Sequence, residues 1–175
     1  DRYHAAVNAL VAHGDAYLCY CTNEELDQRR RAAQAHGLPP GYDGHCRDLR
    51  PDQVRAYEAE GRRPAVRFRL PDTGETVVED AIRGRVVFDN ATLTDFVILR
   101  ANGVPTYHFS AVYDDVDMGV THVIRGEDLF PSTPLHVHVF RALGRPTPPA
   151  FAHLPLIVGA DRRKLSKRRD KLSVQ

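Results

Sequence analysis

Cysteine is scarce in this sequence, with three residues among 175. Because that number is small and odd, the sequence argues against a disulfide framework and favours a reducing cytoplasm. Long apolar runs are also missing, since no stretch approaches the roughly 20 residues that a membrane-spanning helix needs. The opening residues show no signal-peptide pattern. The sequence therefore predicts a cytoplasmic protein that has no membrane partner.

The chain also has little net charge, because 24 basic residues face 23 acidic ones. The chain as a whole therefore lacks the large excess of positive charge that would indicate a nucleic-acid partner. The basic residues are nevertheless clustered at 29–31, 62–63 and 162–171, and such patches can contact phosphates without a high overall charge. A solvated surface is the alternative, and we favour it for residues 29–31. The length allows one domain or two small lobes.

Apolar periodicity and turn residues predict mixed α and β elements. Thr22 and Glu25 have the spacing of a capping box, which marks the start of a helix. Helices are expected at residues 3–13, 23–36, 52–60 and 134–143, and strands at 65–70, 76–80, 85–88, 96–100, 105–109, 121–124 and 154–158. The central hairpins indicate α+β structure, and the strand–helix–strand order after residue 120 predicts a parallel sheet.

Two segments in the last third of the chain carry the candidate chemistry. In the first, a strand-like run leads into Arg125-Gly126-Glu127-Asp128, and prolines then open a helix. In the second, Lys164 and Lys167 bracket a Leu-Ser pair just after a turn. Ammonium groups placed on such a loop can offset the charge that develops on a leaving pyrophosphate. A solvated basic tail is an equal alternative for the second segment taken alone.

The order and spacing of VIRGED and KLSKR give the chain a resemblance to the catalytic domain of class I aminoacyl-tRNA synthetases, specifically the glutamyl-tRNA synthetase family. KLSKR is similar to the second signature of that family, KMSKS, which is commonly KLSKR in the glutamyl branch. The resemblance covers nearly all 175 residues, including the stretch from Thr106 to Met118. It implies an α/β fold, in which part of a Rossmann-like catalytic domain carries an inserted α+β domain.

The resemblance also implies a division of the chain. Residues 1–17 would end the first Rossmann half, 18–105 would form the inserted domain that holds the tRNA acceptor end, and 106–175 would form the second half. The first family signature, His-Ile-Gly-His or a close variant, is absent from this sequence. We therefore expect an internal piece of the catalytic domain, and activity of this stretch alone is an open question.

By the same resemblance, Lys164 and Lys167 are the catalytic residues that hold the triphosphate of ATP, with Ser166 capping their turn. Glu127 and Asp128 match positions near the nucleotide.

The glutamate pocket would contain Tyr107 and Arg125. An arginine at the carboxyl end of a strand can bind a carboxylate through two N–H groups. An ion pair of Arg125 with Glu127 or Asp128 is the alternative.

Cys19, Cys21 and Cys46 form a second constellation, in which the third cysteine follows the second by 25 positions. Two thiolates near a turn and a third from a loop suit tetrahedral zinc, whereas buried cysteines that only fill the core are the alternative. By residue type the fourth ligand would be His45 or Asp48. The resemblance favours Tyr42, with Asp48 next, and zinc held by four side chains would be structural.

The resemblance implies a glutamate–tRNA ligase, a monomer whose partners are L-glutamate, ATP with Mg²⁺, and tRNA-Glu. Glutamate would be activated to glutamyl-adenylate and then transferred to the tRNA. Two alternatives stay open: the short paralogue that glutamylates queuosine in a tRNA, and a non-catalytic zinc-containing fragment that binds tRNA. The cysteines argue against a glutaminyl enzyme, but the sequence leaves open whether tRNA-Gln is also charged.

Overall fold

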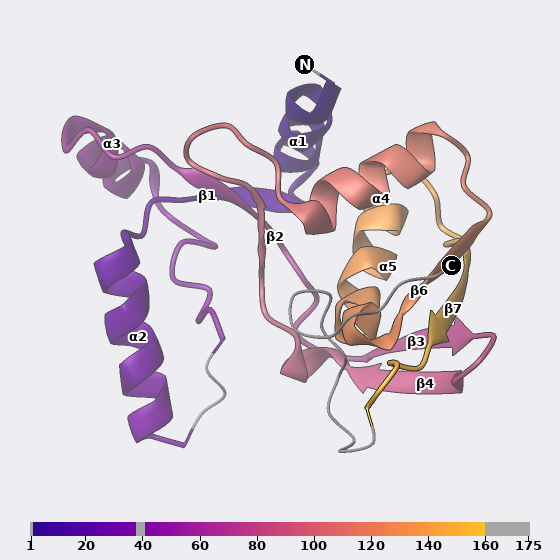
Figure 1. Ribbon diagram of the computed structural model, residues 1–175. Coiled ribbons are helices and arrows are strands. Elements are labelled where there is room, and N and C mark those ends of the chain that lie inside the picture. The colour runs from indigo at the N-terminus through magenta and orange to yellow at the C-terminus, as the bar shows by residue number, and fades with distance from the viewer. Residues whose placement is uncertain (1, 38–40, 160–175) are drawn as a thin grey trace.

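The computed structural model describes residues 2–37 and 41–159 of the chain (Figure 1). Within these residues the backbone forms five α-helices, two 3₁₀ helices and seven strands in two sheets. The α-helices are α1 (Arg2–His13), α2 (Asn23–Ala35), α3 (Pro51–Ala59), α4 (Tyr107–Asp117) and α5 (Thr133–Ala142). The strands are β1 (Ala16–Cys19), β2 (Ala65–Phe68), β3 (Glu75–Asp80), β4 (Gly84–Asp89), β5 (Val97–Leu99), β6 (His122–Gly126) and β7 (Ala150–Leu154), and the 3₁₀ helices are η1 (Asn90–Thr92) and η2 (Glu127–Ser132).

The first sheet is antiparallel and has the order β1-β2-β5. Figure 1 shows α2 and α3 on one side of these strands, with α4, α5 and the second sheet on the other. The predicted capping box at the start of α2 is confirmed, because the Glu25 N–H donates to Thr22 Oγ1 and the Thr22 N–H donates to Glu25. The capping box therefore fixes the start of α2 directly after Cys21.

The second sheet is mixed and has the order β4-β3-β7-β6. Strand β7 runs parallel to both β6 and β3, while β3 and β4 form an antiparallel hairpin. The predicted parallel sheet after residue 120 is thus confirmed for β6 and β7, which α5 connects. The β3–β4 hairpin agrees with the strands predicted at residues 76–80 and 85–88, but its place beside β7 was not predicted. The sheet therefore takes strands from both sides of the boundary predicted at residue 105, and the predicted domain limits stay a prediction.

The prediction of a strand at residues 105–109 is wrong. Pro105 makes a single antiparallel bridge to Leu99, and the helix α4 begins two residues later. The apolar side chains of this segment recur at three- and four-residue intervals, which is helical spacing. The helix buries Phe109 and Val112 completely against the core, so tertiary packing decided between strand and helix.

The strand predicted at residues 154–158 is also displaced, since β7 covers Ala150–Leu154. Its register with β6 turns Phe151 and His153 into the core, where both are nearly inaccessible. The apolar residues on which the prediction relied lie outside the core, because Leu154 and Ile157 are 48% and 72% exposed. The other predicted helices and strands agree with the structure to within about two residues at each end.

Two hydrophobic clusters stabilise the fold. The large one joins α1, α4, α5 and strands of both sheets, and the small one contains Tyr17, Cys19 and Cys46. Figure 1 shows α5 between α4 and the β3–β4 hairpin, which is why it is the most buried helix. Among the described residues, no helix combines the length and the apolar character needed to cross a bilayer.

Replacing Phe109 by alanine tests the helical assignment of α4. We expect the free energy of unfolding to fall by about 3–5 kcal/mol, because the side chain is fully buried and would leave a cavity. The matched change Met118→Ala, at the exposed end of the same helix, should alter it by less than about 0.5 kcal/mol. Urea unfolding of both variants measures the difference. Equal effects would contradict the packing described here.

Candidate active site and thiol cluster

Arg125 lies near the carboxyl end of β6, at the edge where ligands collect in parallel sheets, as the sequence predicted. Its guanidinium makes four hydrogen bonds, to two imidazoles, a hydroxyl and a carbonyl. Nε donates to His153 Nε2 at 2.9 Å, and Nη1 lies 3.2 Å from His136 Nδ1. Nη2 donates to Thr133 Oγ1 at 3.0 Å and to the Leu129 carbonyl at 3.4 Å. Since a guanidinium has five N–H groups, one N–H on Nη1 is left to meet a ligand.

The alternative ion pair of Arg125 is not formed, because Arg125 pairs with no carboxylate among the described residues. Glu127 instead pairs with Arg83 and accepts a hydrogen bond from the Leu156 N–H at 3.1 Å. The Leu156 amide and, after it, Arg83 lower the pKa of Glu127. The carboxylate thereby fixes the backbone just after β7.

Gly126 allows the chain to bend tightly between Arg125 and Glu127. A Cβ at this position would lie 2.6 Å from Asp128 Oδ1. Only glycine therefore lets the Asp128 carboxylate fold back over the backbone of the Arg-Gly-Glu-Asp segment without a shift.

His153 connects Arg125 to a buried carboxylate. Its Nδ1 lies 2.6 Å from Asp80 Oδ2, and both side chains are completely buried. Burial alone would raise the pKa of Asp80. The hydrogen bonds from His153 and from the backbone N–H groups of Arg83 and Ile82 outweigh this effect and lower the pKa to about 2. Asp80 is therefore an ionised carboxylate at the heart of the second sheet.

On the other side of Arg125, two histidines continue the contacts. His136 Nε2 lies 3.1 Å from His108 Nδ1, and His136 is 2% exposed. Burial, followed by the nearby Arg125 cation, lowers the pKa of His136 to about 3, and the same two causes lower the pKa of His108. Both imidazoles are therefore neutral at pH 7.

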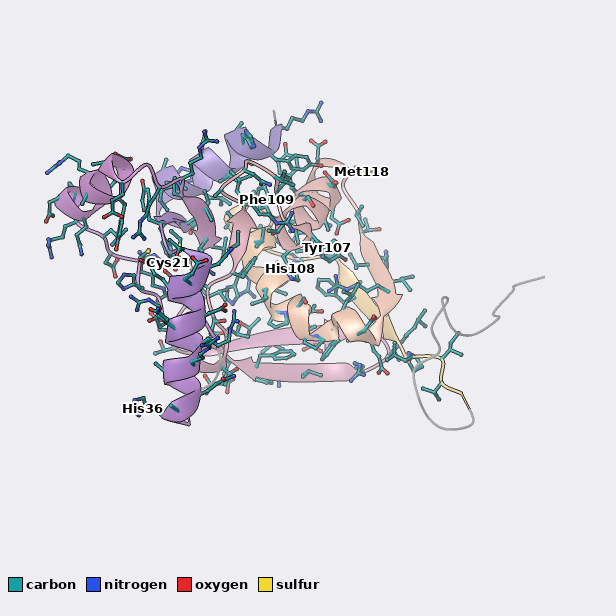
Figure 2. The ribbon with its side chains drawn as sticks, turned by 60° about the vertical axis from the view of Figure 1, so that its left-hand side comes forward. Cys21, His36, Tyr107, His108, Phe109 and Met118 are labelled. Carbon is teal, nitrogen blue, oxygen red and sulfur yellow. The ribbon has the colours of Figure 1, made fainter. Side chains whose placement is uncertain are left out.

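Tyr107 belongs to the same region. Its half-exposed ring lies 6.1 Å from the His136 ring, between centroids, and Figure 2 shows it beside His108 at the start of α4. The structure thus brings both predicted glutamate-binding residues, Tyr107 and Arg125, into contact with one imidazole. Lys164, Ser166 and Lys167 lie outside the described residues, so their predicted meeting with Arg125 stays a prediction.

Sequence reasoning missed most of this network, namely Asp80, His108, Thr133, His136 and His153. His136 and His138 point to different faces of α5, because residues two apart on a helix do not share a face, and His138 bonds Thr76 instead. The signal that could have found His153 is its inward position in the alternation of β7.

The three cysteines form a compact group. Their Sγ atoms all lie within 4.8 Å of one another, and no disulfide links them. Cys19 ends β1, Cys21 follows it, and Cys46 comes from the turn after residue 44, which the sequence predicted as a loop. Figure 2 shows Cys21 at the start of α2, away from Tyr107. The buried group is consistent with a zinc site, as the spacing predicted.

Tyr42 joins the thiols, whereas Asp48 does not. The Tyr42 hydroxyl lies 3.5 Å from Cys19 Sγ and 4.0 Å from Cys21 Sγ, and it accepts a hydrogen bond from the Cys46 N–H at 2.9 Å. Asp48 accepts a hydrogen bond from Arg69, and its side chain is 83% exposed.

Arg67 supplies a buried positive charge beside the thiols. Its Nε donates to Cys19 Sγ at 3.3 Å, and its guanidinium carbon lies 3.7 Å from the centre of the Tyr42 ring. Hydrogen bonds from Cys21 and Cys46 lower the pKa of Cys19, and Arg67 adds to that shift. A fixed cation stabilises thiolates, which are the form of cysteine that binds metal. The donor set and its surroundings therefore fit a metal ion.

Known proteins resemble this chain along its whole length. The family model for the catalytic domain of class I tRNA synthetases (E and Q) matches residues 1–175. The chain is 50% identical over 175 residues to the glutamate–tRNA ligase of Moorella thermoacetica, covering 100% of this chain and 36% of that protein. It is 48% identical over 174 residues to the glutamate–tRNA ligase of Thermodesulfovibrio yellowstonii, covering 99% and 36%.

Among solved structures, a glutamate tRNA ligase from Elizabethkingia meningosepticum in complex with its amino acid superposes with a TM-score of 0.83 and 37% identity. The match covers 95% of this chain and 34% of that one. The glutamate-tRNA synthetase from Elizabethkingia anophelis gives a TM-score of 0.84 at 36% identity, covering 95% and 35%. The chain therefore spans about a third of the length of the relatives that it matches.

The lowered pKa of His136 predicts how stability depends on pH. The unfolded chain takes up a proton near the ordinary value of 6.5, whereas the folded protein does so only near 3. The contribution of His136 is thus fully present above pH 6.5 and is lost as the pH falls toward 3. As the pH falls over this range, the free energy of unfolding should decrease by up to about 1.4 kcal/mol more per pH unit in the wild type than in His136→Asn.

Asparagine at position 136 keeps an acceptor near Arg125 but cannot titrate. Urea unfolding at a series of pH values measures the slopes. The control His13→Gln, which removes an exposed imidazole at the end of α1, should keep the slope of the wild type. Parallel curves for the wild type and His136→Asn would show that His136 is not held neutral.

Proposed function

Because the chain belongs to the catalytic-domain family of class I tRNA synthetases for glutamate and glutamine, we propose that this protein acts as a glutamate–tRNA ligase. Relatives named glutamate–tRNA ligase, 45–50% identical over the full chain, support glutamate over glutamine as the substrate. The partners would be L-glutamate, ATP with Mg²⁺, and tRNA-Glu. The free thiols favour a cytoplasmic location.

The environment of Arg125 is the observation that carries this proposal. Its guanidinium keeps a full positive charge, yet none of its four hydrogen-bond partners is a carboxylate. A partly buried cation that is hydrogen-bonded to no carboxylate among the described residues attracts an anion, and the side-chain carboxylate of glutamate has the right charge. Tyr107, which is half-exposed and contacts the same histidine, would close the pocket over the aliphatic part of the substrate.

The reaction would proceed in two steps. The α-carboxylate of glutamate attacks the α-phosphorus of ATP in line and expels pyrophosphate. The terminal ribose hydroxyl of the tRNA then attacks the mixed anhydride and releases AMP. The protein contributes position and electrostatics, with no covalent enzyme intermediate. Mg²⁺ bound with ATP would neutralise part of the phosphate charge.

Lys164 and Lys167 would offset charge on the leaving pyrophosphate, with Ser166 capping their turn. The bond from Leu156 to Glu127 supports this role, because it holds the segment that leads to the lysines at the end of β7 near Arg125. Glu127 and Asp128 would lie beside the nucleotide. In this proposal, residues 1–17 and 106–175 form the two Rossmann-like parts, and residues 18–105 hold the tRNA acceptor end.

We further propose that Cys19, Cys21, Cys46 and Tyr42 hold a structural Zn²⁺. Three thiolates and one phenolic oxygen complete a tetrahedral set in which no position is left for substrate. The metal would tie the end of β1 to the loop that carries Cys46, and Arg67 would balance part of the negative charge of the ligands.

The test of the function is glutamate-dependent ATP–pyrophosphate exchange by the full-length protein, with and without tRNA-Glu. Glutamine serves as the matched control substrate, because it has the same shape without the charge. We expect exchange with glutamate only. Exchange at background level under all conditions would overturn the proposal.

Arg125→Gln tests the role of the guanidinium. We expect kcat/KM for glutamate in the exchange reaction to fall on the order of a hundredfold, because a charge-assisted hydrogen bond to the substrate is lost. Arg85→Gln removes an exposed arginine of β4 that pairs with Glu79 at the surface, and it should leave kcat/KM unchanged. A normal KM for glutamate in folded Arg125→Gln would exclude Arg125 from the pocket.

Metal analysis of three variants tests the zinc site. Cys46→Ser should lose most of the bound zinc. Tyr42→Phe should weaken zinc binding by at least the roughly 10–100-fold that is typical when an outer-shell partner is lost. Asp48→Ala should bind zinc like the wild type, because its carboxylate is exposed and contacts Arg69. Zinc loss in Asp48→Ala with normal binding in Tyr42→Phe would make Asp48 the fourth ligand.

A further inference from the structure

The hydrogen bonds around Arg125 determine where each histidine carries its proton. Arginine keeps all its N–H groups in proteins, so the Nε of Arg125 can only donate. His153 Nε2, at 2.9 Å, must then accept, and the proton of this neutral ring lies on Nδ1. That proton is donated to Asp80 Oδ2 at 2.6 Å. The two hydrogen bonds therefore have fixed directions: Arg125 donates to His153, and His153 donates to Asp80.

The same reasoning applies on the opposite side of the guanidinium. Nη1 of Arg125 donates to His136 Nδ1, so the proton of this ring lies on Nε2. Nε2 donates in turn to His108 Nδ1 at 3.1 Å. Both rings that touch Arg125 thus have a fixed tautomer, and each acts as an acceptor toward the cation.

Asp80 is the carboxylate that sets this arrangement. It carries its charge next to His153 and not next to Arg125, so it orients the cation without neutralising it directly. On the basis of the proposed function, we propose that Asp80 and His153 are positioning residues for glutamate recognition. Asp80 fixes the tautomer of His153, and His153 orients the guanidinium of Arg125 toward the substrate carboxylate.

The surroundings of Asp80 make a decisive substitution available. Its Oδ1 accepts hydrogen bonds from the backbone N–H groups of Ile82 at 3.0 Å, Arg83 at 2.9 Å and His153 at 3.3 Å. In Asp80→Asn the amide oxygen must therefore occupy the Oδ1 position, because an amide NH₂ there would face three donors. The NH₂ group then faces His153 Nδ1.

The change of hydrogen-bond donor at His153 Nδ1 also affects Arg125. His153 Nδ1 has to accept from the new amide, so the proton moves to Nε2. Two N–H groups, of His153 and of Arg125, then point at each other, and the guanidinium must turn away from its place. An exchange of aspartate for asparagine that keeps geometry but imposes the wrong histidine tautomer is an established way to disable a polar site.

Steady-state exchange kinetics of the full-length protein provide the first measurement. Asp80→Asn should raise KM for glutamate on the order of tenfold to a hundredfold, because one charge-assisted contact to the substrate is misplaced. KM for ATP should stay within about twofold, since the substitution does not alter the groups proposed to hold ATP. An unchanged KM for glutamate would overturn the inference.

Val78→Ala is the matched control, because Val78 is a buried residue of the same strand, two positions from Asp80, and it lies outside the network. It should lower the melting temperature and leave KM for glutamate unchanged. If KM rose equally in both variants, the effect of Asp80→Asn would be a general loosening of β3, and the positioning role would be wrong.

Nitrogen NMR of the imidazole rings gives a second readout that does not require activity. The ¹⁵N shifts should report His153 protonated at Nδ1 in the wild type and at Nε2 in Asp80→Asn. Nε2 protonation in the wild type would refute the inference whatever the enzyme does. If the tautomers are as expected but the wild type shows no glutamate-dependent exchange, the proposed function fails and the ordering of the network stands.

Discussion

A guanidinium held in a partly buried site, with no hydrogen bond to a carboxylate of the described residues, is the constraint on which this structure depends. Such a cation is stable only where acceptors surround it, and each acceptor must itself be oriented. Arg125 meets this requirement with two imidazoles, a hydroxyl and a carbonyl. These partners satisfy its N–H groups but leave its charge available. The site is thereby prepared for an anion before the anion arrives.

The topology of the second sheet follows from this requirement. Asp80 ends β3 and His153 lies in β7, and the parallel pairing of these strands places the carboxylate against the imidazole. Helix α5 begins at the same edge and supplies Thr133 and His136. The β3–β4 hairpin is therefore more than a cover for the sheet, because the last residue of β3, Asp80, is proposed to orient Arg125 on β6 through His153.

The sequence could predict the parts of the site that are close together in the chain. Cys19 and Cys21 flank one turn, and Arg125 stands where an apolar run meets a loop, so their placement needed no knowledge of the fold. His153 and Asp80 are 73 positions apart, and they meet only because β3 and β7 pair. Periodicity within one strand carries no information about its neighbour in the sheet. The start of α4 was misread because a short apolar run suits a strand and a buried helix equally well.

Arg67, which is buried, and Arg125, which is partly buried, show how the charge of the surroundings can distinguish a structural site from a binding site. Arg67 donates to Cys19 and lies against the Tyr42 ring, so the ligands of the proposed zinc site would match its charge. Arg125 is only partly buried, and its hydrogen-bond partners are two imidazoles, a hydroxyl and a carbonyl. A charge that is already balanced holds the fold together, while an unbalanced one selects a ligand. In the proposed function, the lack of a carboxylate among the direct partners of Arg125 is as important to glutamate binding as the charge of Arg125, because a carboxylate in place of either imidazole would compete with the substrate.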